Sequence, residues 1–152
     1  MRALTFLLAL LASPLAAAAA DLTAGDLLVS DAYAFETPPN VRSGAAYFSL
    51  TNSGDAPDAL VGIEAATANA TLHASETAAD GVVRMTEVEE LVVQPGESVV
   101  LEPGAMHVML TDLAGPLVAG ETLAARLVFR EAGALQVTFD IVSRGGGHDD
   151  HH

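Results

Sequence analysis

The sequence predicts an all-β fold, a β-sandwich or barrel of short strands in a single domain. Short apolar runs that contain Val, Thr and Tyr recur along the chain, with Gly, Pro and Asp between them. This spacing is typical of sandwiches and barrels. No segment sustains the 3.6-residue apolar period of an amphipathic helix. The chain also has no internal repeat and no interdomain linker, so one domain is expected.

The expected strands alternate with turn sequences in a regular order. Turns are expected at "PPN" (38–40), "SGDAPD" (53–58), "AADG" (78–81), Pro95-Gly96, Pro103-Gly104, "AGPLVAGE" (114–121) and "REAG" (130–133). Gly and Pro supply the backbone angles that such turns need. Residues 112–117 are compatible with a helical turn. The strands between the turns lie within 26–37, 45–52, 59–65, 70–77, 82–90, 91–104 (two short runs), 105–113, 122–129 and 134–142.

The first 20 residues predict a secretory signal peptide. Arg2 is followed by an apolar stretch as far as Leu11, then by Pro14 and an Ala-rich end. The apolar stretch is too short to span a bilayer comfortably. We therefore expect cleavage near Ala20, and a processed chain that is not an integral membrane protein. Cleavage leaves 152 − 20 = 132 residues, which is enough for one hydrophobic core over 21–144.

The charge and the cysteine count exclude several function classes. The chain has 20 acidic and 6 basic residues, for a net charge of −14, and no lysine. Such a chain repels nucleic acid and anionic lipid, which bind through clustered Lys and Arg. The chain has no cysteine, which removes disulfides and thiolate ligands. A blue-copper electron-transfer site is thereby excluded. No histidine lies in a nucleophilic Ser motif, so we expect no enzyme and no catalytic residues.

The scarce nitrogen and sulfur ligands lie in two places. Ahead of the C-terminal tail, the processed chain contains the histidines His73 and His107 and the methionines Met85, Met106 and Met109. Successive side chains of a strand point to opposite faces. His107 and Met109 therefore share one face of their strand, whereas Met106 is expected to point into the core, where methionine commonly fills space.

His73 and Met85 flank the turn "AADG" and form a second His and Met pair. A five-residue loop over 77–81 is centred on Ala79, which lies midway between the two residues. In a hairpin of this register His73 and Met85 are directly opposite, with Cβ atoms about 5 Å apart. The prediction depends on the loop length because the length sets the register.

Two imidazoles and two thioethers suit Cu(I) better than other common metals. Thioether sulfur is soft and selects Cu(I), and imidazole binds copper as well. Structural zinc favours thiolates, and Ca²⁺ or Mg²⁺ favours oxygen. All four donors are uncharged, so the site keeps a net charge of about +1 that an acidic chain accommodates. The alternative is that these side chains merely pack, in an exported interaction or adhesion domain without functional metal.

The spacing of the four residues resembles the motif of the periplasmic copper chaperones called PCuAC. His73 is followed by Ala74 at the optional Met position, ten further residues, Met85, twenty-one residues, and His107-x-Met109. The stretches "GAAYFSLTNSGDAPDALVG", "DGVVRM", "LEPGAMHVMLTDLAGPL" and "LVFREAG" are similar to that family too.

The resemblance implies a cupredoxin-like Greek-key β-sandwich that holds Cu(I) through His73, Met85, His107 and Met109. It also implies delivery of copper to a haem–copper (cytochrome c) oxidase in the bacterial periplasm. The expected partners are an oxidase subunit or another periplasmic copper chaperone. A general role in periplasmic copper storage or resistance is the alternative.

The C-terminal tail is a candidate second metal site. Three glycines (145–147) lead to "HDDHH", and residues 145–152 are expected to form a flexible tail. Nitrogen and oxygen donors of this kind suit Cu(II) or zinc. The alternative is an acidic end without a metal role. The candidate ligands are His148, Asp149, Asp150, His151 and His152.

Overall fold

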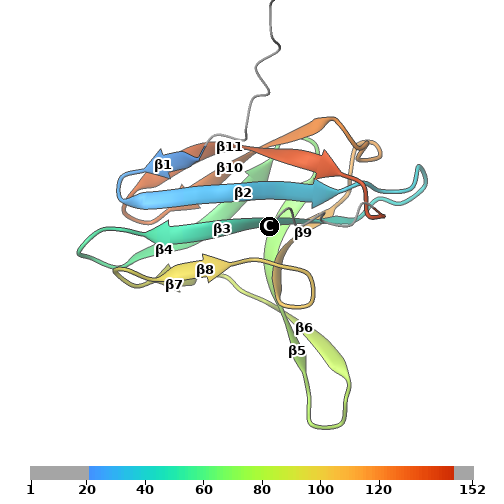
Figure 1. Ribbon diagram of the computed structural model, residues 1–152. Coiled ribbons are helices and arrows are strands. Elements are labelled where there is room, and N and C mark those ends of the chain that lie inside the picture. Colours follow the sequence, from blue (N-terminus) through green and yellow to red (C-terminus); the bar gives the residue numbers. More distant parts are fainter. Residues whose placement is uncertain (1–20, 146–152) are drawn as a thin grey trace, which may run out of the picture.

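The computed structural model describes residues 21–145, which form eleven β-strands and no helix (Figure 1). The predicted all-β class is therefore confirmed, in one domain. The strands are β1 (Leu22–Ala24), β2 (Leu27–Phe35), β3 (Gly44–Asn52), β4 (Asp58–Ala65), β5 (Asn69–Thr77), β6 (Val83–Glu87), β7 (Leu91–Val93), β8 (Ser98–Val100), β9 (Met106–Thr111), β10 (Thr122–Phe129) and β11 (Gly133–Val142).

The strands are hydrogen-bonded into one mixed sheet that curls around the core. Its order is β6-β5-β9-β3-β2-β11-β10-β4-β7, and β1 and β8 pair with β2 and β3. Every pair is antiparallel except β2 with β11. The curl brings β4 against β5, so the two halves of the sheet face each other as in a sandwich. The β5–β6 hairpin projects away from this body (Figure 1).

The segment after β9 contains no helical turn, so the helical alternative for 112–117 is wrong. Its backbone groups bond to distant strand ends instead. Leu117 N–H donates to Thr37 Oγ1 (2.9 Å), and Leu117 O accepts the Thr37 N–H (2.9 Å). Leu113 N–H donates to Arg42 O (3.1 Å). Because these bonds hold the segment open along β2 and β3, its N–H groups cannot close a helical turn.

The core is formed by the inward faces of alternating strand residues. In β10 every second residue is buried, from Leu123 to Phe129. Phe48 of β3 and Phe139 of β11 meet across the core, with ring centroids 6.2 Å apart in an edge-to-face arrangement. Such a pair contributes both apolar burial and favourable ring geometry. The side chains on the opposite face of β3 and β9 point away from this core.

A β-bulge in β2 places two aromatic side chains on that opposite face. The register between β2 and β3 shifts between Ser30 and Tyr33, where Asp31 has a φ of 52°. Without the extra residue, alternation from the buried Leu27 would send Tyr33 and Phe35 into the core. Ala34 is buried there instead, and the two aromatic rings lie on the outer side of the sheet.

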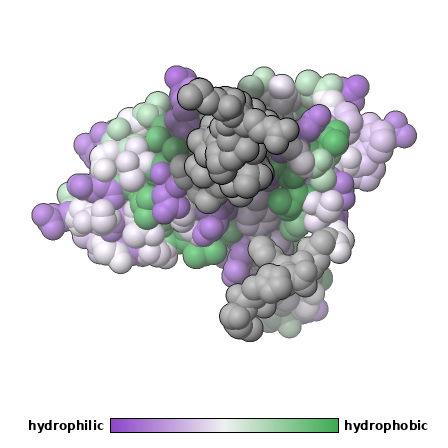
Figure 2. Space-filling model, turned by 45° about the horizontal axis from the view of Figure 1, so that its top comes forward, coloured by the Kyte–Doolittle hydropathy of each residue, from purple (hydrophilic) through white to green (hydrophobic). Residues whose placement is uncertain are grey.

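The outer surface is polar and acidic, with apolar patches between the polar groups. Figure 2 shows hydrophilic side chains spread over the visible face, interspersed with green hydrophobic ones. Three ion pairs, Arg84–Asp80, Arg126–Glu64 and Arg130–Glu90, are solvent-exposed, so each contributes little to stability. Within residues 21–145, no helix has the length and hydropathy needed to cross a bilayer.

Candidate metal centre

The two histidines of the domain face each other on neighbouring strands. β5 and β9 pair so that His73 is directly opposite His107. The ring centroids are 6.0 Å apart, and the ring planes differ by 26°. Their sequence neighbours Leu72 and Val108 are buried in the core, so both rings lie on the opposite face of the sheet. His107 is nevertheless only 8% exposed, so one half of the pair is largely shielded from water.

The separation of the rings is compatible with a single metal ion bound by both. A metal–nitrogen bond of about 2 Å places an imidazole centroid about 3 Å from the ion. Two rings bound to one ion then have centroids about 5 Å apart at a tetrahedral angle and about 6 Å apart in a linear arrangement. The observed 6.0 Å lies within this range. The sheet holds the backbone of His73 in place, because His73 lies on the interior strand β5, which is paired with β6 on one side and β9 on the other.

One nitrogen of His73 lacks a partner although it is buried. Nδ1 of His73 has no hydrogen-bond partner among the described residues. Nε2 lies 3.0 Å from the Thr71 hydroxyl, two residues earlier on the same strand face. If Nε2–H donates to Thr71 Oγ1, Nδ1 is left with a free lone pair. A buried unpaired acceptor is costly in a protein, and a metal ion would satisfy it.

Met109 joins this face, and Met106 does not. Met109 is opposite Thr71 on β5 and Ala45 on β3, two residues from His107 and therefore on the same side of the sheet. Met106 is partly buried and packs against the core. The prediction that alternation separates the two methionines of β9 is confirmed.

The predicted register of the β5–β6 hairpin is wrong by two residues. His73 is opposite Glu87, and Met85 is opposite Ser75. The turn closes one residue later than expected: Ala78 N–H donates to Val82 O (2.9 Å), and Gly81 has a φ of 80°. A three-residue loop with a left-handed glycine at its end produces this closure, and it centres the hairpin on Asp80 rather than Ala79.

The corrected register keeps Met85 on the histidine face. A shift of two residues preserves the side-chain alternation, whereas a shift of one would have inverted it. Met85 becomes the diagonal neighbour of His73, at a distance of roughly 7–8 Å, which a long side chain can bridge. Met85 is 57% exposed. One face of β6, β5 and β9 thus carries Met85, His73, His107 and Met109.

Sequence reasoning missed Thr71 and the carboxylate of Glu87. Thr71 precedes His73 by two positions, so strand alternation alone could have placed it on the same face. Glu87 required the correct hairpin register. Among residues 21–145, no three His, Cys, Asp or Glu side chains cluster as a metal site. The tail candidates, 148–152, and the expected signal peptide lie outside the described residues.

An aromatic group continues the same face beyond His107. Tyr47 lies two residues from Ala45, the partner of Met109, and stacks on Tyr33 with centroids 5.1 Å apart. Phe35 meets Tyr47 edge-on at 5.7 Å. Burial raises the pKa of Tyr33, and the nearby Tyr47 and Glu102 raise it further. Burial also raises the pKa of Tyr47, against a smaller opposing effect of Arg144. Both phenols therefore stay neutral at physiological pH.

Thr71→Val should weaken metal binding without unfolding the domain. Valine keeps the shape but removes the hydroxyl that orients the His73 ring. Loss of such a partner typically costs 10- to 100-fold in metal affinity. Competitive Cu(I) titration measures the change, and Thr71→Ser, which keeps the hydroxyl, is the matched control. Equal affinities for the valine variant and the parent chain would contradict the orienting role.

The comparisons with known proteins agree with this fold. The LpqE-like family matches residues 27–141. No curated protein matches the chain significantly. A solution structure of CuI-DR1885 from Deinococcus radiodurans is 30% identical, covers 86% of this chain and 85% of its own, and has a TM-score of 0.62.

Two further structures resemble the domain at lower identity. The copper-bound PCuAC domain from PmoF2 has a TM-score of 0.70 at 22% identity and covers 82% of this chain and 98% of its own. The apo PCuAC domain from PmoF1 has a TM-score of 0.71 at 24% identity, covering 82% and 99%. By its match over 27–141 and its fold, the chain belongs to the LpqE-like family and has the structure of a PCuAC domain.

Proposed function

We propose that this protein is a metallochaperone that binds one Cu(I) ion through His73, Met85, His107 and Met109. The buried Nδ1 of His73, which has no hydrogen-bond partner among the described residues, carries this proposal. The ring that holds it faces the His107 ring, with centroids 6.0 Å apart. If the His and Met side chains of an exported domain merely packed together, we would expect that nitrogen to have a hydrogen-bond partner, because buried polar groups are usually paired. The copper-bound state of two structural relatives supports the same metal.

The ligand set favours a carrier over a permanent cofactor site. All four donors are neutral, so the ion keeps its positive charge beside an acidic surface, and no thiolate holds it tightly. Of the proposed ligands, His107 is shielded from water and Met85 is exposed, which supports a site between the domain body and solvent. An ion held in this way can be passed on by ligand exchange from the Met85 side. We infer a carrier rather than an enzyme.

We infer the cellular role from the sequence pattern. The expected signal peptide and the His and Met spacing of PCuAC chaperones support work in the bacterial periplasm, with a haem–copper oxidase as recipient. The copper-loaded chain should then lose its metal to the copper-free copper-binding domain of such an oxidase. A storage or resistance protein would retain the metal under the same conditions.

Met109→Leu should lower Cu(I) affinity because it replaces a soft donor with a side chain of similar volume. We expect a loss of at least about tenfold, the lower bound for a lost outer partner of a metal site. The measurement is an anaerobic Cu(I) titration against a competing chelator. Met106→Leu on the same strand is the matched control, and its affinity should not change. Oxidation of the parent methionines to sulfoxides removes both proposed thioether donors and should lower the affinity at least as much as Met109→Leu. Equal affinities throughout would refute thioether ligation.

A further inference from the structure

The β5–β6 hairpin ends the sheet with an open edge beside the candidate metal centre. β6 is the last strand of the sheet order, and among the described residues its only partner is β5. All five residues of β6 are exposed, and the hairpin projects beyond the body of the domain (Figure 1). Exposed edge strands are templates for pairing with another chain, and monomeric proteins usually protect them.

The register shows which backbone groups of β6 are free. Ala78 N–H donates to Val82 O, and Val88 N–H donates to Leu72 O. In an antiparallel ladder every second residue exchanges such bonds with its partner strand. The even-numbered residues of β6 therefore face β5. The N–H and C=O groups of Val83, Met85 and Glu87 point away from the sheet, where an added strand could bond to them.

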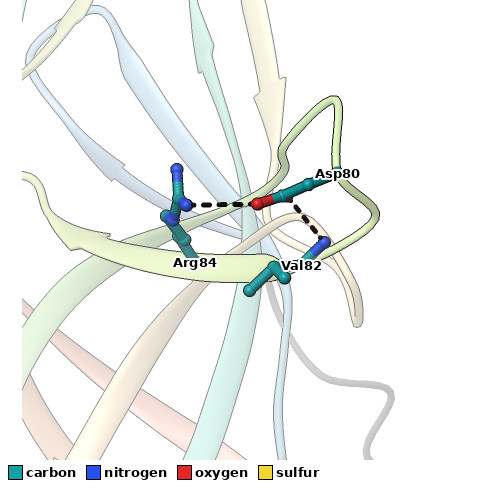
Figure 3. A network of polar contacts seen from close by, with 3 residues as sticks. All are labelled: Asp80, Val82 and Arg84. Atoms are coloured by element: carbon teal, nitrogen blue, oxygen red, sulfur yellow. Dashed lines mark hydrogen bonds and ion pairs between the residues drawn. The ribbon is translucent and has the colours of Figure 1, made fainter.

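The side chains along this edge are apolar at alternate positions. Val83 is 63% exposed and Met85 is 57% exposed, and both lie on the face that carries His73. At the tip, Asp80 accepts the Val82 N–H (3.1 Å) and contacts Arg84 at 3.5 Å (Figure 3). These contacts brace the turn and offset the positive charge of Arg84. A rigid edge loses less conformational freedom when a partner binds.

The acidic side chains around the β6 edge favour a positively charged partner. Residues 69–90 carry one basic side chain, Arg84, and five acidic ones, Glu76, Asp80, Glu87, Glu89 and Glu90. Of these, Asp80 and Glu90 are paired with arginines. A second copy would bring the same acidic edge on a chain of net charge −14, which opposes self-pairing. A basic segment gains attraction from the same carboxylates.

We propose that the open edge of β6 is the docking site for an extended, basic segment of a copper-exchanging partner. The segment adds to the sheet as a strand beside β6, bonding to the outward groups of Val83, Met85 and Glu87. Its own side chains then lie about 5 Å from Met85. Met85 is therefore the proposed copper ligand that lies at the interface between the two proteins. This proposal rests on the proposed function, because it treats Met85 as the copper ligand through which the ion is exchanged.

The experiment uses the copper-free processed chain and a short peptide of alternating lysine and valine with one central methionine. Two-dimensional NMR follows binding, and amide hydrogen exchange follows protection. The amides of Val83, Met85 and Glu87 should become protected, and binding should weaken with added salt. Val83→Pro removes one outward N–H without touching the β5 ladder, and should weaken binding about three- to tenfold. Val83→Thr keeps that N–H and controls for the lost apolar contact.

Three results overturn the proposal. One is that the three amides gain no protection at millimolar peptide. Another is that a peptide with glutamate in place of lysine binds equally well. The third is protection of the same amides in the chain alone with a concentration-dependent dimer, which would assign the edge to a second copy. Because no copper is present, these results are independent of the Cu(I) titration. Amide hydrogen exchange in the unmodified chain tests the proposal even if Val83→Pro fails to fold.

Discussion

The His73→Ala, His107→Ala double variant should lose Cu(I) binding almost completely. Both imidazoles are candidate ligands, and their rings are 6.0 Å apart on adjacent strands. Loss of a partner that only orients a ligand costs 10- to 100-fold in affinity, so loss of two ligands should cost more than about 1,000-fold. Anaerobic titration against a competing chelator measures the affinity, and X-ray absorption at the copper edge reports on the remaining donors.

Two controls separate ligand loss from other effects. A chain that ends at Gly147 lacks three histidines but keeps the domain, so it should bind Cu(I) as the parent does. His73→Gln with His107→Gln keeps polar side chains of comparable size and should also lose the metal. Retention of Cu(I) by the double alanine variant would refute this ligand set. A drop in Cu(II) stoichiometry in the shortened chain alone would support the separate tail site.

Phe48→Ala should produce the largest loss of stability of any single change considered. Phe48 is 1% exposed and meets Phe139 edge-on across the core. Truncation of a buried phenylalanine costs about 3–5 kcal/mol, through lost apolar burial and the cavity left behind. Urea unfolding followed by circular dichroism measures the free energy of unfolding.

The control for Phe48→Ala is Val100→Ala on the adjacent strand β8. Val100 is largely exposed, so its truncation should change the free energy of unfolding by no more than about 0.5 kcal/mol. Because Phe48 lies on the core face of β3, Cu(I) affinity of the folded Phe48→Ala protein should stay near that of the parent. A stability loss below about 1 kcal/mol would contradict the packing of Phe48 against Phe139.

Local patterns in the sequence were sufficient for ten of the eleven strands, all except the three-residue β1, and for part of the site. The turn residues delimit strands close to those observed, and alternation alone separates Met109 from Met106 on β9. Strand boundaries and side-chain alternation both depend on residues only a few positions away in the chain, so local sequence is enough to predict them. The scarcity of nitrogen and sulfur donors, with no cysteine in the chain, then restricts the metal. Thr71 could have been found by the same alternation.

The hairpin register depended on a detail of turn geometry. Gly81 takes a left-handed conformation, and the loop closes through Ala78 and Val82. Several loops are compatible with "AADG", and each gives a different partner for His73. Met85 was nevertheless placed on the observed face of the sheet because the predicted and observed registers differ by two residues. Met85 therefore remained on the correct face with the wrong opposite neighbour.

The sequence by itself determined ten of the eleven strands, the faces of β9 that carry Met106 and Met109, and the chemistry of the candidate ligands. Only the tertiary structure decided that β5 lies beside β9, with His73 opposite His107, and that a bulge at Asp31 turns Tyr33 outward. The physical reason is that side-chain alternation is a local property of extended backbone. Which strands become neighbours depends instead on how the whole sheet curls to bury residues such as Phe48 and Phe139, far apart in the chain.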